Sequence, residues 1–319
     1  MSNSSCSGFS DKPHLCDVII AVRKTSGSLS FVGCLFMIFV LWLFKRYVVF
    51  AQRLILYLSF AALFDSIAYL MSSDIDDGRM CNFQGWWLTF FDWMVLLCVS
   101  CLTFNLFMNV IYQTVTQKYE WLYIGICIAI PLIVSCLPFF GDRYGPAGAW
   151  CWIVEDIGWR IGIWYGPLFI IIAVMIVTYG YIIYTLSRKA SSWEGTYDPD
   201  TERQHRLLKE DIKPLRVYPL IYLAVSILPL INRIQNAFSP DNHVFILVLL
   251  ASICSPLHGA LNAVVFGMDK ETLQKLRPRE IKLALFNRQS RQTVREYPYY
   301  ATFGNAMEVL MSDSEEEPG

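Results

Sequence analysis

The sequence contains seven apolar stretches, each long enough to cross a lipid bilayer as a helix. A helix rises 1.5 Å per residue, so about 20 apolar residues match the ~30 Å hydrocarbon core. The predicted spans are 25–44, 53–72, 86–112, 121–140, 161–186, 215–236 and 244–267. Ionisable residues interrupt four of them: Asp65, Asp92, Arg233 and His258. Seven such runs in series predict an all-α membrane protein, a seven-transmembrane helix bundle.

A soluble all-helical protein is the alternative, and the composition argues against it. Of the 319 residues, 55% are apolar and only 17% are charged, whereas a soluble domain carries about 25% charged residues. Four of the predicted spans, 25–44, 121–140, 161–186 and 244–267, show no period that would expose a polar face. The pattern therefore favours helices surrounded by lipid.

Four regions follow from this pattern: a short extracellular N-terminus at 1–24, the bundle at 25–267, a juxtamembrane amphipathic region at 268–288 and a disordered cytoplasmic tail at 289–319. The first 24 residues lack the apolar stretch of a cleavable signal peptide. We expect the first span to direct membrane insertion.

Lysine and arginine predict the orientation, because they concentrate on the cytoplasmic side of membrane proteins. With the N-terminus outside, eighteen of the Lys and Arg residues considered fall inside and six outside. The sequence therefore predicts that the N-terminus is outside and the C-terminus is inside, at the plasma membrane.

Four cysteines fall on the predicted outer side. Cys81 precedes the third span and Cys151 lies between the fourth and fifth spans. A disulfide between them would hold that loop across the mouth of the bundle, in an oxidising space where such bonds persist. A second pair, Cys6 with Cys16, is left open. Asn3 begins a glycosylation sequon on the same side.

Charged residues inside the membrane are expensive and normally face a partner or a cavity. Asp92 and Arg233 are expected at similar depths below the outer face, and Arg160 marks the outer start of the fifth span. One interpretation is an Asp92–Arg233 ion pair that only joins two helices. The other is a pocket whose surplus arginine charge binds an anionic ligand group.

A second polar set lies from mid-membrane to the cytoplasmic end. Its members are Asp65, Asn105, Asn109, His258 and Asn262. Hydrogen bonds between membrane helices are worth about 1 kcal/mol each. The set therefore fits either simple adhesion between helices or a network that rearranges as a switch.

Several short motifs resemble one receptor family. They are Trp-Cys-Trp-Ile at 150–153, Arg160 with Tyr-Gly-Pro at 165–167, Asn-Arg-Ile at 232–234, His-Gly-Ala-Leu-Asn-Ala at 258–263 and Arg-Leu-Ile-Leu-Tyr-Leu-Ser at 53–59. Over about residues 25–285 the chain resembles a G-protein-coupled receptor of the cyclic-AMP-receptor-like group (class E), including its orphan animal members. Neither the acidic-Arg-Tyr triplet nor the Asn-Pro-x-x-Tyr motif of rhodopsin-like receptors is present.

This resemblance implies a receptor that transmits an extracellular ligand to a heterotrimeric G protein, with cyclic AMP as one ligand candidate. We expect the ligand site to include Asp92, Trp152, Arg160, Tyr165 and Arg233. No metal or cofactor is expected, and no nucleic acid partner. The acidic tail end at 312–317 is a candidate site for a kinase or arrestin.

Three other classes of membrane protein are alternatives to a receptor. A retinal protein needs a Schiff-base lysine, which the seventh span lacks. An intramembrane hydrolase needs several zinc ligands, and His258 is the one histidine in a predicted span; no enzyme is expected. A small seven-helix transporter remains the main alternative, although such proteins usually show repeated halves.

Overall fold

The computed structural model describes residues 13–71, 78–112, 114, 116–147, 150–154, 157–192, 217–238 and 244–289. The chain divides into two compact units, Met1–Leu273 and Gln274–Gly319. Across the described residues both consist of helices, apart from one two-stranded sheet in the first unit.

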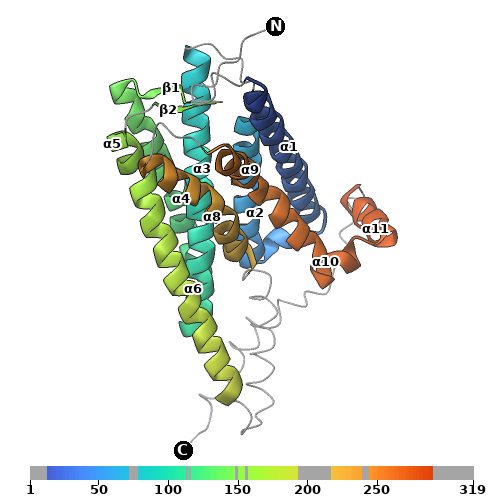
Figure 1. Cartoon of the computed structure of the whole chain (residues 1–319). Helices are drawn as coiled ribbons and strands as arrows, with labels where there is room; N and C mark the ends of the chain where they lie inside the picture. Colours follow the sequence, from blue (N-terminus) through green and yellow to red (C-terminus); the bar gives the residue numbers. More distant parts are fainter. Residues whose placement is uncertain are drawn as a thin grey trace, which may run out of the picture. The chain divides into compact units, whose positions relative to one another are not determined.

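Seven long helices make up the described part of the first unit (Figure 1). They are α1 (Pro13–Leu43), α2 (Phe50–Leu70), α3 (Arg79–Phe107), α4 (Glu120–Cys136), α6 (Gly166–Ser192), α8 (Val217–Phe238) and α9 (Phe245–Met268). Shorter turns extend three of them: a π-helical turn at Met108–Tyr112 after α3, a 3-10 turn at Leu137–Gly141 after α4, and α5 (Ile157–Arg160) with a π-helical turn at Ile161–Tyr165 before α6.

Six of these segments are long and apolar enough to cross a membrane. They are His14–Leu43, Phe50–Leu70, Arg79–Tyr112, Gln117–Gly141, Gly158–Thr185 and Phe245–Met268. The predicted sixth span, 215–236, coincides with α8, but the apolar part of α8 is the shorter stretch Val217–Asn232. Arg233 follows this stretch directly. A seventh crossing and the orientation of the bundle therefore remain predictions.

The first helix begins at Pro13, twelve residues before the expected start of the first span. Arg23 and Lys24 fall in the expected extracellular N-terminus at 1–24, yet both lie inside α1. The Arg23 side chain is only 6% exposed. Its burial on aromatic rings, described below, explains how an arginine sits within this helix.

Helices α1 and α9 approach closely because small residues face each other. A Cβ atom at Gly33 would lie 2.9 Å from the Cβ of Ala263, and one at Gly259 would lie 2.8 Å from the Sγ of Cys34. Membrane helices commonly use glycine and alanine in this way, since close backbones gain van der Waals contact.

Ser30 joins α1 to α9 at this interface. Its hydroxyl donates to the carbonyl oxygen of Pro256 and accepts from the backbone N–H of Ala260, at 3.1 Å. Pro256 and Ala260 are about one turn apart in α9, so one hydroxyl holds two positions of that helix against α1.

The two strands form a hairpin at one end of the bundle, called here the hairpin end (Figure 1). Strand β1 (Tyr144–Pro146) pairs antiparallel with β2 (Cys151–Ile153), with Tyr144 opposite Ile153. The Tyr144 hydroxyl donates to the Ser135 carbonyl at 2.7 Å. Burial raises the pKa of Tyr144, so this hydroxyl stays protonated and remains a donor.

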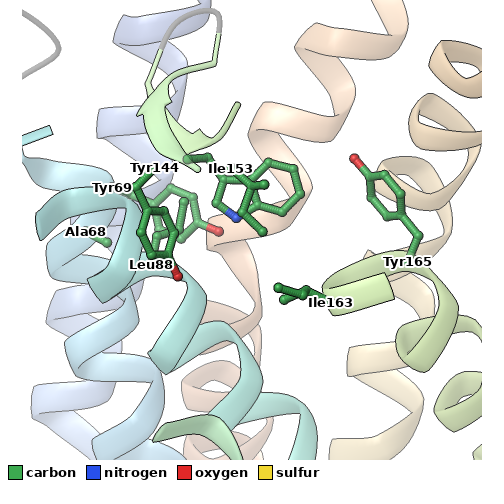
Figure 2. Packing of buried hydrophobic residues seen from close by; sticks show 8 residues of the cluster. Ala68, Tyr69, Leu88, Tyr144, Ile153, Ile163 and Tyr165 are labelled. Atoms are coloured by element: carbon green, nitrogen blue, oxygen red, sulfur yellow. The ribbon is translucent and has the colours of Figure 1, made fainter. Parts of the chain in front are cut away.

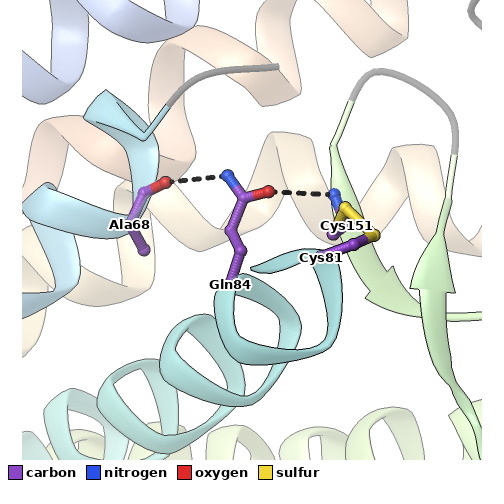
Figure 3. The surroundings of a disulfide bond; sticks show 4 residues. All are labelled: Ala68, Cys81, Gln84 and Cys151. Atoms are coloured by element: carbon purple, nitrogen blue, oxygen red, sulfur yellow. Dashed lines mark hydrogen bonds between the residues drawn. A yellow bond between two sulfur atoms is a disulfide. The ribbon is translucent and has the colours of Figure 1, made fainter. Parts of the chain in front are cut away.

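The predicted disulfide between Cys81 and Cys151 is confirmed, and it ties β2 to the start of α3 (Figure 3). Gln84, one turn further along α3, strengthens the connection. Its amide nitrogen donates to the Ala68 carbonyl at 3.3 Å, and its oxygen accepts from the Cys151 N–H at 3.4 Å. Gln84 is 1% exposed, so α2, α3 and the hairpin are joined inside the protein.

Beyond α9, the predicted juxtamembrane region forms two short helices. Helix α10 spans Lys270–Lys275, and in the second unit α11 spans Pro278–Gln289. Pro278 begins α11, as suits a residue without a backbone N–H to satisfy.

Several predictions concern residues outside those described. They are the sequon at Asn3, the cysteine Cys6 and the tail beyond residue 289. Cys16 is disulfide-bonded, but the pairing with Cys6 stays a prediction.

Candidate functional site

A cavity of about 120 Å³ lies beside the hairpin, among the helices. Trp150 and Trp152 of the hairpin line it, together with residues from α1, α2, α3, α8, α9 and the start of the fifth span. The disulfide holds these tryptophans in place, because it fixes β2 to α3. The fold therefore places residues from most of the long helices around one cavity.

Three of the five predicted ligand residues line this cavity: Asp92, Trp152 and Tyr165. Asp92 projects from α3 and accepts a long hydrogen bond of 3.5 Å from the Tyr69 hydroxyl of α2. Trp152 and Tyr165 form an aromatic wall, with ring centroids 6.1 Å apart. Residues far apart in the sequence are thus brought together.

Arg160 is not among the residues that line the cavity. Its guanidinium donates to the Ile153 carbonyl from Nε at 3.1 Å and from Nη2 at 2.9 Å. It also lies over the Trp152 ring, 5.6 Å from the centroid. These contacts support the hairpin. Arg233 belongs to α8, but its side chain lies outside the described part of the structure, so the ligand roles of both arginines stay predictions.

Arg23 of α1 lines the cavity instead, and the sequence analysis missed it. Its guanidinium lies over two rings, 4.9 Å from the centroid of Tyr69 and 4.7 Å from that of Trp150. Cation–π contact with both rings favours the buried charge. The apolar run at 18–22 before Arg23 could have indicated that this arginine lies within the helix.

The wall of the cavity merges with a buried hydrophobic cluster around the hairpin. Figure 2 shows Tyr69 and Leu88 on one side of this cluster and Ile163 and Tyr165 on the other, with Ile153 between them. Ile153 is fully buried. The cavity therefore has a rigid apolar frame in which a few polar groups are placed.

His258 lies at the α9 side of the cavity and connects it to the predicted switch residues. Its Nε2 is 3.8 Å from the Oδ2 of Asp65 in α2, and its Nδ1 contacts the Ser255 carbonyl at 3.0 Å. Asp65 is fully buried, and Asn262 is 5% exposed. Asp65 and His258 were predicted together, and the structure brings them together.

Asn105 belongs to a separate cluster. Its Oδ1 accepts from the Thr116 hydroxyl at 2.7 Å, and Thr116 accepts in turn from the Tyr123 hydroxyl at 2.9 Å. This chain of hydrogen bonds joins α3 to α4. Asn109 lies in the π-helical turn that ends α3. In the described structure Asp65 and His258 form one group and Asn105 belongs to another, so the switch role of the five residues stays a prediction.

Two arginine clusters mark the opposite end of the bundle. Arg53 of α2 donates to both carboxylate oxygens of Glu120 in α4, at 2.6 and 2.7 Å, and the Tyr57 hydroxyl donates to the same carboxylate at 2.7 Å. Arg46 donates to the Thr272 hydroxyl of α10 at 2.6 Å. Both clusters join elements that are distant in the sequence.

Candidate spans, a disulfide-tethered hairpin and a cavity enclosed by helices define an integral multi-pass membrane protein of the receptor type. Residues 14–285 match the family model described as the slime mold cyclic AMP receptor. The chain therefore belongs to the cyclic-AMP-receptor-like family of G-protein-coupled receptors.

Individual relatives agree with this assignment. The chain is 32% identical over 251 residues to Cyclic AMP receptor-like protein A of Dictyostelium discoideum, covering 77% of this chain and 63% of that protein. It is 25% identical over 266 residues to G-protein coupled receptor 1 of Arabidopsis thaliana, covering 82% and 81%. The chain thus spans less than two thirds of the first relative's length. These relatives bear receptor names, which fits a protein that is not an enzyme.

Proposed function

We propose that the protein is a plasma-membrane receptor that transmits binding of an extracellular ligand to a cytoplasmic heterotrimeric G protein. The observation that carries the proposal is the cavity beneath the tethered hairpin, lined from α1, α2, α3, α8 and α9. A ligand that contacts several helices at once can favour one packing of the bundle over another. Membership in a receptor family supports the same conclusion.

The hairpin end is the proposed outer face. Its disulfide suits an oxidising compartment, and the excess of lysine and arginine at the predicted inner loops favours the same orientation. The Arg53–Glu120 and Arg46–Thr272 clusters then lie on the cytoplasmic side, where the G protein would bind.

Transmission from the cavity would pass through α9. Ser255 and His258 line the cavity, and the Pro256 carbonyl between them accepts a hydrogen bond from Ser30 of α1. His258 also lies beside Asp65 of α2. A ligand that moves this part of α9 would change the packing of α1, α2 and α9 together, and would thereby reach the cytoplasmic ends of these helices.

The ligand is proposed to carry an anionic group. Cyclic AMP is a candidate because several relatives are named as cyclic AMP receptors. Asp92 in the same cavity weakens the positive field that a phosphate alone would need.

A cell-based screen tests the proposed function. Cells that express the protein would be exposed to candidate extracellular compounds, while intracellular cyclic AMP, calcium, membrane current and compound uptake are recorded. We expect a second-messenger response that depends on the protein and is lost in cells without Gα subunits. Uptake or current that persists without Gα subunits, with no messenger response, would show a transporter instead.

A further inference from the structure

The cavity contains buried groups of opposite charge on different walls. Arg23 comes from α1 and Asp92 from α3, and both line the cavity. Among the described side chains no ion pair joins Arg23 to a carboxylate. A buried arginine without such a pair is costly, so it calls for an explanation.

The Arg23 guanidinium has an unused hydrogen-bond donor. Arg23 is 6% exposed, and its Nη2 has no hydrogen-bond partner among the described residues. The guanidinium carbon lies over the rings of both Tyr69 and Trp150. The N–H groups of a guanidinium lie in its plane, which is the geometry that binds a carboxylate or phosphate. The two ring contacts also restrain the guanidinium, so little side-chain entropy is lost on binding.

Tyr69 stands between the two charges. Its ring face contacts Arg23, while its hydroxyl lies 3.5 Å from Asp92 Oδ1. The guanidinium and the carboxylate are therefore held apart by about the size of one aromatic ring, which suits a molecule whose own charges are separated by a few bonds. A purely anionic ligand would meet repulsion from Asp92, and a purely cationic one would meet repulsion from Arg23.

Aromatic side chains complete this arrangement. Trp152, Trp164 and Tyr165 also line the cavity, and the Trp152 and Trp164 rings meet edge to face at 6.1 Å. An ammonium group near such rings gains cation–π attraction in addition to the carboxylate. The volume of about 120 Å³ is below the roughly 300–1,000 Å³ typical of drug-sized ligands, which favours a small molecule.

We infer that the cavity binds a small zwitterion, whose carboxylate or phosphate contacts Arg23 and whose ammonium group contacts Asp92. This inference rests on the proposed function only in treating the cavity as the ligand site. It identifies the chemical class of the ligand and separates it from cyclic AMP, which carries no ammonium group. The same chemistry occurs in amino acids in solution and in the headgroup of phosphatidylethanolamine.

Direct binding tests the inference without any G protein. The full chain would be purified into nanodiscs of anionic phosphatidylglycerol, which contain no zwitterionic lipid. Its thermal unfolding would be measured with linear ω-amino acids of two to six carbons and with O-phosphoethanolamine. The corresponding alkyl amines, alkyl carboxylates and cyclic AMP serve as singly charged comparisons. A parallel sample in phosphatidylethanolamine nanodiscs tests the lipid source.

Two variants and two matched controls locate the effect. Arg23→Gln and Asp92→Asn each remove one charge from the cavity. Lys24→Gln and Asp17→Asn remove the same charges from α1 positions that do not line it. We expect at least one zwitterion to raise the unfolding temperature of the parent chain. Its apparent affinity should fall about tenfold or more in each cavity variant and remain within about twofold in the controls.

Three results would overturn the inference. They are no stabilisation by any zwitterion in either nanodisc, equal stabilisation by a singly charged analogue or cyclic AMP, and undiminished zwitterion binding in both cavity variants. Stabilisation that appears only with phosphatidylethanolamine would assign the zwitterion to the lipid. If zwitterions bind but G-protein activation is absent, the proposed function fails while the ligand class stands.

Discussion

Replacing Ser30 by alanine tests how α1 and α9 are held together. The Ser30 hydroxyl makes two hydrogen bonds to α9, one to the Pro256 carbonyl and one from the Ala260 N–H. Alanine removes both. The variant therefore loses two contacts between the helices.

The size of the effect follows from these two contacts. Interhelical hydrogen bonds in membrane proteins average about 0.6 kcal/mol, with a maximum near 1.7. Two losses give a destabilisation of about 1 kcal/mol, which corresponds to a fall of about 2–4 °C in the unfolding temperature for a chain of this size.

Ser28→Ala is the matched control. Its hydroxyl donates to the Lys24 carbonyl at 2.9 Å within α1, and the Ser28 side chain is exposed. Thermal unfolding in nanodiscs would compare the two variants with the parent chain. If Ser30→Ala is as stable as Ser28→Ala, the Ser30 hydroxyl does not hold the two helices together.

Two further changes test the ends of the bundle. Cys81→Ser should lower the free energy of unfolding by up to about 4 kcal/mol, as chain entropy predicts for a disulfide closing 70 residues, and it should weaken ligand binding in the cavity. Cys254→Ser, which changes a free thiol, is the control. Equal thermal stability of the two variants would contradict the tether. Glu120→Gln leaves Arg53 without its carboxylate partner. It should lower the free energy of unfolding by about 1–2 kcal/mol, a modest loss because both side chains are about one fifth exposed and water screens the pair. In a double-mutant cycle, Arg53→Gln should destabilise the Glu120→Gln variant much less than it destabilises the parent chain. Additive losses of stability would show that the pair does not interact.

Much of the fold could be predicted from local signals. The expected spans at 53–72, 121–140 and 244–267 correspond to α2, α4 and α9 with boundaries within a few residues. Apolar length is a property of the sequence itself, so it needs no knowledge of the neighbours. The disulfide was predictable too, because few cysteines lie outside the spans.

The start of α1 and the composition of the cavity wall were harder to predict. Arg23 falls in the segment expected to be the extracellular N-terminus, because nothing nearby in the sequence indicates that the rings of Tyr69 and Trp150 contact it. Arg160 was expected in the pocket, but it supports the hairpin by bonding to the Ile153 carbonyl. Which way an arginine points depends on groups from other elements, and these meet only after folding.

The sequence by itself determined that the chain enters lipid, how many apolar segments it has, and to which family it belongs, since these depend on composition and on short motifs. Only the tertiary structure decided which charges face the cavity. The rotation of each helix and the position of the tethered hairpin place Arg23 and Asp92 around Tyr69, because packing against neighbouring helices, rather than the order of residues along one span, sets which side of a helix is enclosed.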